Sequence, residues 1–179
     1  RWQPAPGDML FRALRGEFGS LPLVAEDLGI ITPEVEALRD AHGLPGMKVL
    51  HFAFGGGADN PYLPHQHVPN AVVYTGTHDN NTTLGWFAEL DAGTRAHLFD
   101  YLGGDTTRMP ELLTRAALAS VARLAMLPMQ DLLELGGEHR MNRPGIANGN
   151  WTWRFTWEQF AEAPLAARYR HLLNLYGRC

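Results

Sequence analysis

Short apolar runs at four places along the chain predict buried β-strands. They cover residues 21–25, 47–54, 72–75 and 125–129. Aliphatic, β-branched or aromatic side chains dominate each run, and glycine or a polar residue follows it. The centres of the first three runs are spaced by roughly 25 residues, which suits repeated βα units joined by right-handed crossovers. The pattern therefore predicts an α/β protein with parallel strands.

Apolar positions at helical spacing predict the helices that connect these strands. One helix starts at Thr32-Pro33, an N-cap followed by a first-turn proline, and ends before Gly43. No linker divides the chain, so we expect residues 1–179 to form a single unit. The remaining expected elements are helices at residues 8–18, 82–90, 94–102, 110–122 and 164–176, and a long loop at 58–69.

Trp151 and Trp153 alternate in the segment 151–155, which would put both indoles on one face of an extended strand. We expect that face to be buried in the core, with sugar stacking by Trp151, Trp153 and Trp157 as the alternative. Asn142, Asn148 and Asn150 are candidates for binding hydroxyl groups, but asparagine beside glycine or proline is first of all a turn signal.

Polar residues follow three of the predicted strands directly. In a (β/α) barrel the carboxyl ends of all strands meet on one face, so these residues are expected to converge. The alternative for the third strand is that the aspartate caps the next helix and the histidine is a satisfied polar neighbour. The pairs concerned are Glu26-Asp27, His78-Asp79 and Gln130-Asp131.

Two chemistries compete for these groups. Carboxylates with a histidine and aromatic side chains suit glycoside chemistry, in which a protonated carboxyl expels the sugar leaving group and another stabilises an oxocarbenium-like transition state. Alternatively, His65 and His67 with His78 and Asp79 could ligate a divalent metal. The two first histidines lie in a proline-rich stretch, which favours a surface loop for them.

The composition is that of one globular unit, with 179 residues, 45% hydrophobic and 19% charged. A net charge of -4 without a basic run argues against nucleic acid or an anionic membrane as partner. No apolar run is long enough to span a bilayer. The only cysteine, Cys179, permits no intrachain disulfide, and the start at Arg1 without methionine suggests a piece of a longer chain.

A series of motifs in fixed order resembles the 4-α-glucanotransferases, also called amylomaltases or disproportionating enzymes, of glycoside hydrolase family 77. The resemblance covers nearly the whole chain. The motifs are LVAEDLG (23–29), LPGMKVL (44–50), NPYLPH (60–65), VVYTGTHDNNTT (72–83), PMQDLL (128–133), RMNRPG (140–145) and GNWTWR (149–154).

The resemblance implies the C-terminal part of a (β/α)8 TIM-type barrel, with about four βα units here. It implies transfer of α-1,4-glucan segments between maltooligosaccharides by a retaining double displacement, without metal or cofactor, in the cytoplasm. Glu26 matches the general acid/base, so its pKa should lie near the working pH. Asp79 matches the carboxylate that supports the transition state, and His78, Asp27 and Asn80 are expected to bind substrate.

The departures from the family pattern limit what this chain could do alone. The family's nucleophilic aspartate sits in an Arg-x-Asp context that is absent here, and a full barrel takes about 250 residues. We therefore expect the nucleophile-bearing N-terminal half to be a partner of this chain, which alone would be inactive and prone to pair through its strand edges. His51 and Asn81 stand where relatives usually carry glutamine and aspartate. The alternatives are a metal-dependent barrel hydrolase and a non-catalytic glucan-binding subunit.

Overall fold

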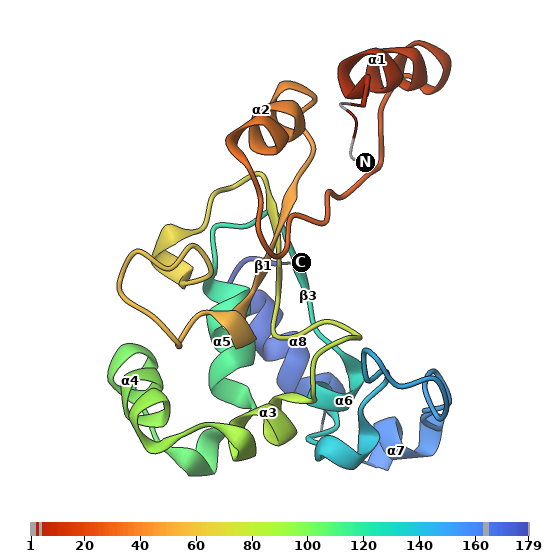
Figure 1. Ribbon diagram of the computed structural model, residues 1–179. Helices are drawn as coiled ribbons and strands as arrows, with labels where there is room; N and C mark the ends of the chain where they lie inside the picture. The colour runs from red at the N-terminus through yellow and green to blue at the C-terminus, as the bar shows by residue number, and fades with distance from the viewer. Residues whose placement is uncertain (1–2, 4, 163–164, 179) are drawn as a thin grey trace.

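The computed structural model describes residue 3 and residues 5–162 and 165–178. Within these ranges the fold is α/β, with a parallel sheet of three strands in the order β1-β2-β3 (Figure 1). The strands are β1 (Gly46–Val49), β2 (Ala71–Tyr74) and β3 (Leu124–Met126). Val49 pairs with Tyr74, and Tyr74 with Met126, so the three strands end at one edge of the sheet.

The strand predicted at residues 21–25 does not form. This segment is an irregular coil, and its Ala25 amide donates to the carbonyl of Pro45, the residue before β1, at 2.9 Å. Pro22 and Pro45 carry no amide proton, so a regular ladder beside β1 loses donors on both sides. The run predicted at 47–54 is also shorter than expected, because the chain turns into a 3₁₀ helix, η1 (Leu50–Phe52), after Val49.

The helices agree with the predicted ones in position, with two additions, α6 and α7, and with 3₁₀ turns. For the predicted helix 164–176, residue 164 lies outside the described residues, and the helix is seen from Leu165. The helices are α1 (Gly7–Phe18), α2 (Pro33–Ala41), α3 (Thr83–Glu89), α4 (Ala92–Leu102), α5 (Glu111–Ala119), α6 (Met129–Leu132), α7 (Trp157–Glu162) and α8 (Leu165–Leu175), with the turns η2 (Pro64–Gln66), η3 (Thr106–Arg108) and η4 (Gly137–His139).

The core lies where the sheet meets the helices from α3 to α5. It contains Leu50, Phe54, Val73, Leu98 and Leu113, each at most 1% exposed. By contrast, α1 and α2 bury none of their residues and stand at the amino ends of the strands, at the top of Figure 1. No helix in the described ranges is both long and apolar enough to cross a membrane.

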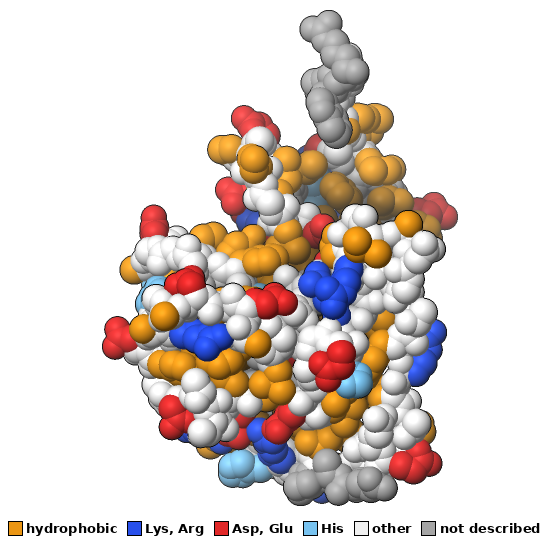
Figure 2. Space-filling view, turned by 60° about the horizontal axis from the view of Figure 1, so that its bottom comes forward, with side chains coloured by type: hydrophobic (Ala, Val, Ile, Leu, Met, Phe, Trp, Pro, Cys, Tyr) orange, Lys and Arg blue, Asp and Glu red, His pale blue; other side chains and the backbone are white. Residues whose placement is uncertain are grey.

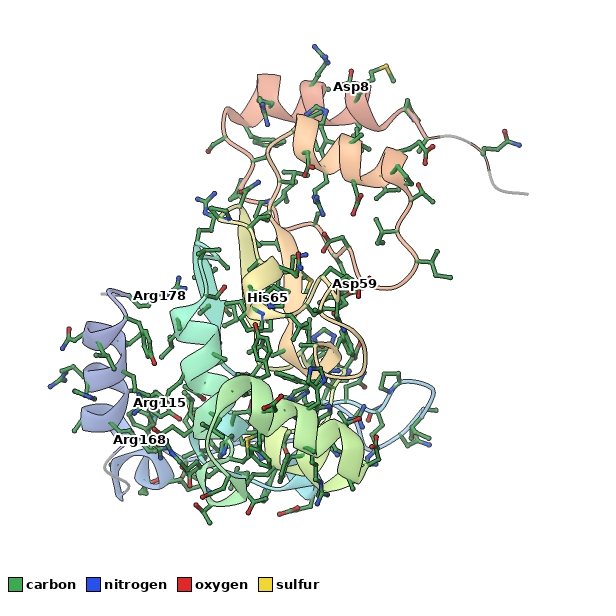
Figure 3. All side chains as sticks on the ribbon, turned by 90° about the vertical axis from the view of Figure 1, so that its left-hand side faces the viewer. Asp8, Asp59, His65, Arg115, Arg168 and Arg178 are labelled. Atoms are coloured by element: carbon green, nitrogen blue, oxygen red, sulfur yellow. The ribbon has the colours of Figure 1, made fainter. Side chains whose placement is uncertain are left out.

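The C-terminal helix α8 is fastened to α5 by charged groups. Arg168 bridges Glu111 on α5 and Glu134, with nitrogen–oxygen distances of 2.9 and 2.5 Å. Figure 3 shows Arg168 and Arg178 between the two helices. The guanidinium of Arg178 donates to three backbone carbonyls at the end of α5, including Leu118 O at 3.0 Å and Ala122 O at 2.6 Å.

We predict that Arg178→Ala lowers the free energy of unfolding by about 2 kcal/mol, because carbonyls past the end of α5 lose a charged donor. Arg178→Lys should recover only part of this, since one ammonium cannot reach three carbonyls in the same fork geometry. Urea unfolding measures both, with Arg170→Ala on the exposed face of α8 as control. Equal stability of Arg178→Ala and the control would contradict the assignment.

Candidate active site

A cavity of about 770 Å³ opens at the carboxyl ends of the strands. Figure 2 brings this end of the sheet toward the viewer and shows charged and imidazole side chains among apolar ones. The cavity therefore combines polar groups that could orient a ligand with apolar walls that could hold its rings. Its polar lining includes Glu26, Thr77, His78, Asp79, Asn80, Asn81, Gln130 and Arg140, and its apolar lining includes Leu28, Met47, Phe52, Tyr74, Met126, Leu127, Met141 and Trp151.

The loop of residues 76–82, between β2 and α3, carries the central polar groups. Inside it, the amide and the hydroxyl of Thr77 both donate to Asn80 Oδ1, each at 2.9 Å, and form a tight turn. Because this turn engages the amide oxygen of Asn80, a contact between Asn80 and a ligand would use the amide nitrogen. Thr82 caps α3 by accepting from the Gly85 amide at 3.1 Å.

Asp79 and His78 are held in place but remain open to the cavity. Asn142 Nδ2 donates to Asp79 Oδ1 at 2.6 Å, and His78 Nε2 lies 3.3 Å from the same oxygen. Arg140 donates to the backbone carbonyl of Asp79. The two site side chains are 51% and 54% exposed, so both can meet a ligand.

Beneath the loop, the buried carboxylate of Asp131 joins its two ends. Thr75, the last residue before the loop, donates its hydroxyl to Asp131 Oδ2 at 2.6 Å. Thr83, the first residue after it, donates its amide and its hydroxyl, each at 2.7 Å. Burial raises the pKa of Asp131, against the opposing effect of these hydrogen bonds. A single carboxylate thus fixes both ends of the segment that carries His78 and Asp79.

His51 continues this buried network. Its ring stacks on Trp86 at 4.5 Å, and its Nε2 lies 3.0 Å from the Thr83 hydroxyl. Because that hydroxyl donates to Asp131, the hydrogen must be carried by Nε2 of a neutral imidazole. Burial lowers the pKa of His51 to about 3, which keeps it neutral. A side chain at Gly76 would come within 2.6 Å of the ring, so glycine is needed there.

Glu26 and Asp27 have different environments although they are adjacent. Glu26 is exposed and lines the cavity from the coil before α2. The Asp27 side chain is 8% exposed; it pairs with Arg39 and accepts from the Met47 amide at 2.7 Å. The cavity lining does not include Asp27, and its expected role in binding substrate stays a prediction. We infer that Asp27 positions Glu26 by tying the coil to β1 and α2.

Two of the three histidines proposed as metal ligands, His65 and His67, lie in hydrogen-bonding contacts away from His78 and Asp79. The ring nitrogens of His65 lie 2.8 Å from the Tyr101 hydroxyl and 2.8 Å from the Ala58 carbonyl. His67 Nδ1 lies 2.7 Å from Ser120 Oγ. Among the residues that the structure describes, no group of three or more His, Cys, Asp or Glu side chains could hold a metal ion. The metal-hydrolase hypothesis therefore loses its ligand set.

The expectation that Trp151 and Trp153 share a core face is wrong. Residues 151–155 form no strand, and Trp151 adopts a left-handed backbone with φ 62°. Trp153 donates from its indole to His139 Nδ1 at 3.1 Å, whereas Trp151 is 54% exposed and lines the cavity. Periodicity could not reveal this difference, because it arises from the conformation of one residue.

Comparison with known proteins places the chain in a family. The family model described as 4-alpha-glucanotransferase matches residues 1–159. The chain belongs to the 4-alpha-glucanotransferase family. This confirms the resemblance found in the motifs.

Individual relatives of the chain support the family assignment. The chain is 54% identical over 162 residues to a 4-alpha-glucanotransferase of Thermus thermophilus, covering 86% of this chain and 32% of the relative. It is 51% identical over 180 residues to that of Synechocystis sp., covering 99% and 35%. It thus spans about a third of the length of these 4-alpha-glucanotransferases.

The fold also matches part of a solved structure. The amylomaltase from Streptococcus agalactiae, in complex with acarbose, superposes with a TM-score of 0.93 at 35% identity. The match covers 99% of this chain and 36% of the amylomaltase. The three-stranded α/β arrangement is therefore that of part of a 4-alpha-glucanotransferase.

We predict that Asp131→Asn lowers the free energy of unfolding by about 2–4 kcal/mol, because an amide cannot accept from all three donors and brings a donor of its own. Amide hydrogen exchange should increase in residues 76–83 more than in the core. Asp100→Asn, at an exposed position on α4, is the matched control. Unchanged exchange in this loop would show that Asp131 does not fix its ends.

His51 should make stability depend on pH. Its pKa is about 3 in the folded state and 6.5 in the unfolded chain, so between these values only the unfolded state binds the proton. The free energy of unfolding is therefore unaffected by His51 protonation above pH 6.5, and it decreases as the pH falls from 6.5 toward 3. Asp131, whose pKa is raised, acts in the opposite direction at the acidic end.

Urea unfolding at about pH 7 and about pH 5 measures the effect, which should amount to about 2 kcal/mol for one histidine. His51→Gln should show a smaller loss over this range than the wild type. Comparing the two proteins isolates His51 from His67, whose pKa burial also lowers. Equal losses in both proteins would contradict the buried, neutral assignment of His51.

Proposed function

We propose that this chain is part of a 4-α-glucanotransferase that moves α-1,4-glucan segments between maltooligosaccharides by a retaining double displacement. The observation that carries the proposal is that Glu26, His78 and Asp79 line one cavity at the ends of the strands. Family membership supports it, as does a relative bound to acarbose, an α-glucan analogue. The proposed location is the cytoplasm.

Glu26 is the proposed general acid/base. It is exposed to the cavity, where it could protonate the glycosidic oxygen of the leaving chain and later take a proton from the acceptor hydroxyl. Its neighbour Asp27 fixes the coil through Arg39 without entering the cavity. This arrangement anchors the coil beside Glu26, while Glu26 itself stays exposed at the cavity.

Asp79 and His78 are the proposed groups for binding the ring at which the bond breaks. Asn142 holds one oxygen of the Asp79 carboxylate, which orients the other toward a sugar hydroxyl or the developing positive charge. His78, beside it, is placed to bind a second hydroxyl. These steps need carboxylates and hydrogen bonds and no organic cofactor.

The nucleophile completes the proposal. We place this chain in the C-terminal part of a (β/α)8 barrel, as one unit, and the attacking carboxylate in the N-terminal part. The chain spans only about a third of the length of its relatives, which leaves room for such a part. The acceptor must compete with water for the covalent intermediate, and the apolar wall of Met47, Phe52 and Met141 favours sugar over water.

We predict that Glu26→Gln, made in the complete protein that contains this chain, lowers kcat for maltotriose disproportionation by about 10³-fold. Asp79→Asn should lower kcat to a similar extent, because it removes the negative charge that stabilises the positively charged transition state. Products can be followed by chromatography of the maltooligosaccharides formed. Glu17→Gln, on the exposed face of α1, is the control.

Retained activity in Glu26→Gln would contradict its role as acid/base. A wild-type protein that binds maltooligosaccharides but never redistributes their chain lengths would instead indicate a glucan-binding subunit.

A further inference from the structure

Trp151 stands in an unusual position at the cavity. It is 54% exposed, although it is a large aromatic residue, and its φ of 62° lies in the left-handed region that side chains other than glycine rarely adopt. Such a conformation costs on the order of 1–3 kcal/mol and persists only where neighbouring bonds enforce it. Neither core packing nor backbone preference explains why the indole is held at this place.

The surrounding segment enforces the position. The Trp151 amide donates to the Met141 carbonyl at 2.9 Å, which closes a loop between residues 141 and 151. Asn150 spans this loop, accepting from the Arg143 amide at 2.9 Å and donating to the Ile146 carbonyl at 2.8 Å. Arg154 donates to the Trp151 carbonyl at 3.0 Å. The indole is therefore held by a loop whose backbone is fixed by these four hydrogen bonds.

The same loop is tied to the polar groups of the cavity. Arg140 and Asn142 donate to the backbone and to the carboxylate of Asp79. The indole of Trp151 lies against the imidazole of His78, with ring centroids 5.0 Å apart and planes at 39°. Its position is thus fixed relative to both groups proposed to bind the ring at the cleavage site.

We propose that Trp151 is a stacking platform for a glucosyl unit of an α-1,4-glucan chain, next to the unit held by His78 and Asp79. This proposal rests on the proposed function and adds a residue that sets the affinity for the glucan. The C–H face of a glucose ring is apolar, and an exposed indole offers it a rigid surface with little conformational entropy to lose. The tilt against His78 turns the indole away from a fully stacked pair, which leaves ring surface for the sugar.

Steady-state kinetics of the complete protein on maltooligosaccharides tests this role. Trp151→Ala should raise KM about tenfold, the equivalent of losing one stacking contact, and change kcat much less. Trp151→Phe should stay close to the wild type, because a smaller aromatic face remains. Trp157→Ala is the matched control, since Trp157 is 72% exposed but does not line the cavity.

Trp151→Gly separates stacking from a structural role. Glycine adopts positive φ without strain, so this variant should melt at or above the temperature of Trp151→Ala while its KM is raised equally. An unchanged KM in Trp151→Ala would overturn the proposal. A fall in kcat with unchanged KM would also overturn it, by showing that the indole only positions Asp79 and His78.

A direct binding titration keeps this outcome distinct from failure of the proposed function. If the wild type redistributes no maltooligosaccharides, the transferase assignment fails, and the affinities of wild type and Trp151→Ala for maltoheptaose are compared by calorimetry. Weaker binding by the variant supports the stacking platform, and equal or undetectable binding by both overturns it.

Discussion

The buried carboxylate of Asp131 is the constraint on which the candidate site depends. It receives three hydrogen bonds, from Thr75 and Thr83, and these two residues flank the loop that carries His78 and Asp79. Within the loop, the Thr77–Asn80 turn sets the local path. From outside the loop, Asn142 donates a hydrogen bond to the Asp79 carboxylate and orients it. The site can therefore present half-exposed polar groups to a ligand and still hold them in defined positions, which is what pre-organised catalysis requires.

Burying the Asp131 carboxylate removes its hydration, and the neighbouring residues offset that cost with hydrogen bonds. A carboxylate without water is tolerated only when hydrogen bonds replace its solvation, and Thr75 and Thr83 supply them. His51, stacked on Trp86, donates from Nε2 to the Thr83 hydroxyl, and the same burial lowers its pKa to about 3. Gly76 is part of this network, because a side chain there would collide with the imidazole. The polar site thus rests on a second, buried polar layer.

Much of the site could be predicted from the sequence because its elements are local. The apolar run of β2 and the polar residues after it are contiguous, so the pattern predicts the strand and the loop together. The strand predicted at 21–25 was wrong because apolar composition does not reveal whether a neighbouring strand can supply hydrogen bonds. The sequence predicts Asp131 as an acid at a strand end, but its hydrogen-bond partners Thr83 and Thr75 are 48 and 56 positions away. Trp151 was misplaced because its left-handed backbone depends on the distant Met141 carbonyl.

The carboxylates of this chain also bear on where the proposed nucleophile lies. A retaining mechanism needs a second carboxyl group about 5–5.5 Å from the acid/base, with an oxygen free to attack. Asp27 is committed to Arg39 and the Met47 amide, and Asp131 is buried beneath the loop. Asp79 is held by Asn142 in a position suited to supporting charge. Meanwhile Leu124 and Met126 on the edge strand β3 are each 47% exposed, as is typical of a surface that packs against further chain. Under the proposed function, the attacking carboxylate therefore enters from the part of the barrel that pairs with this sheet.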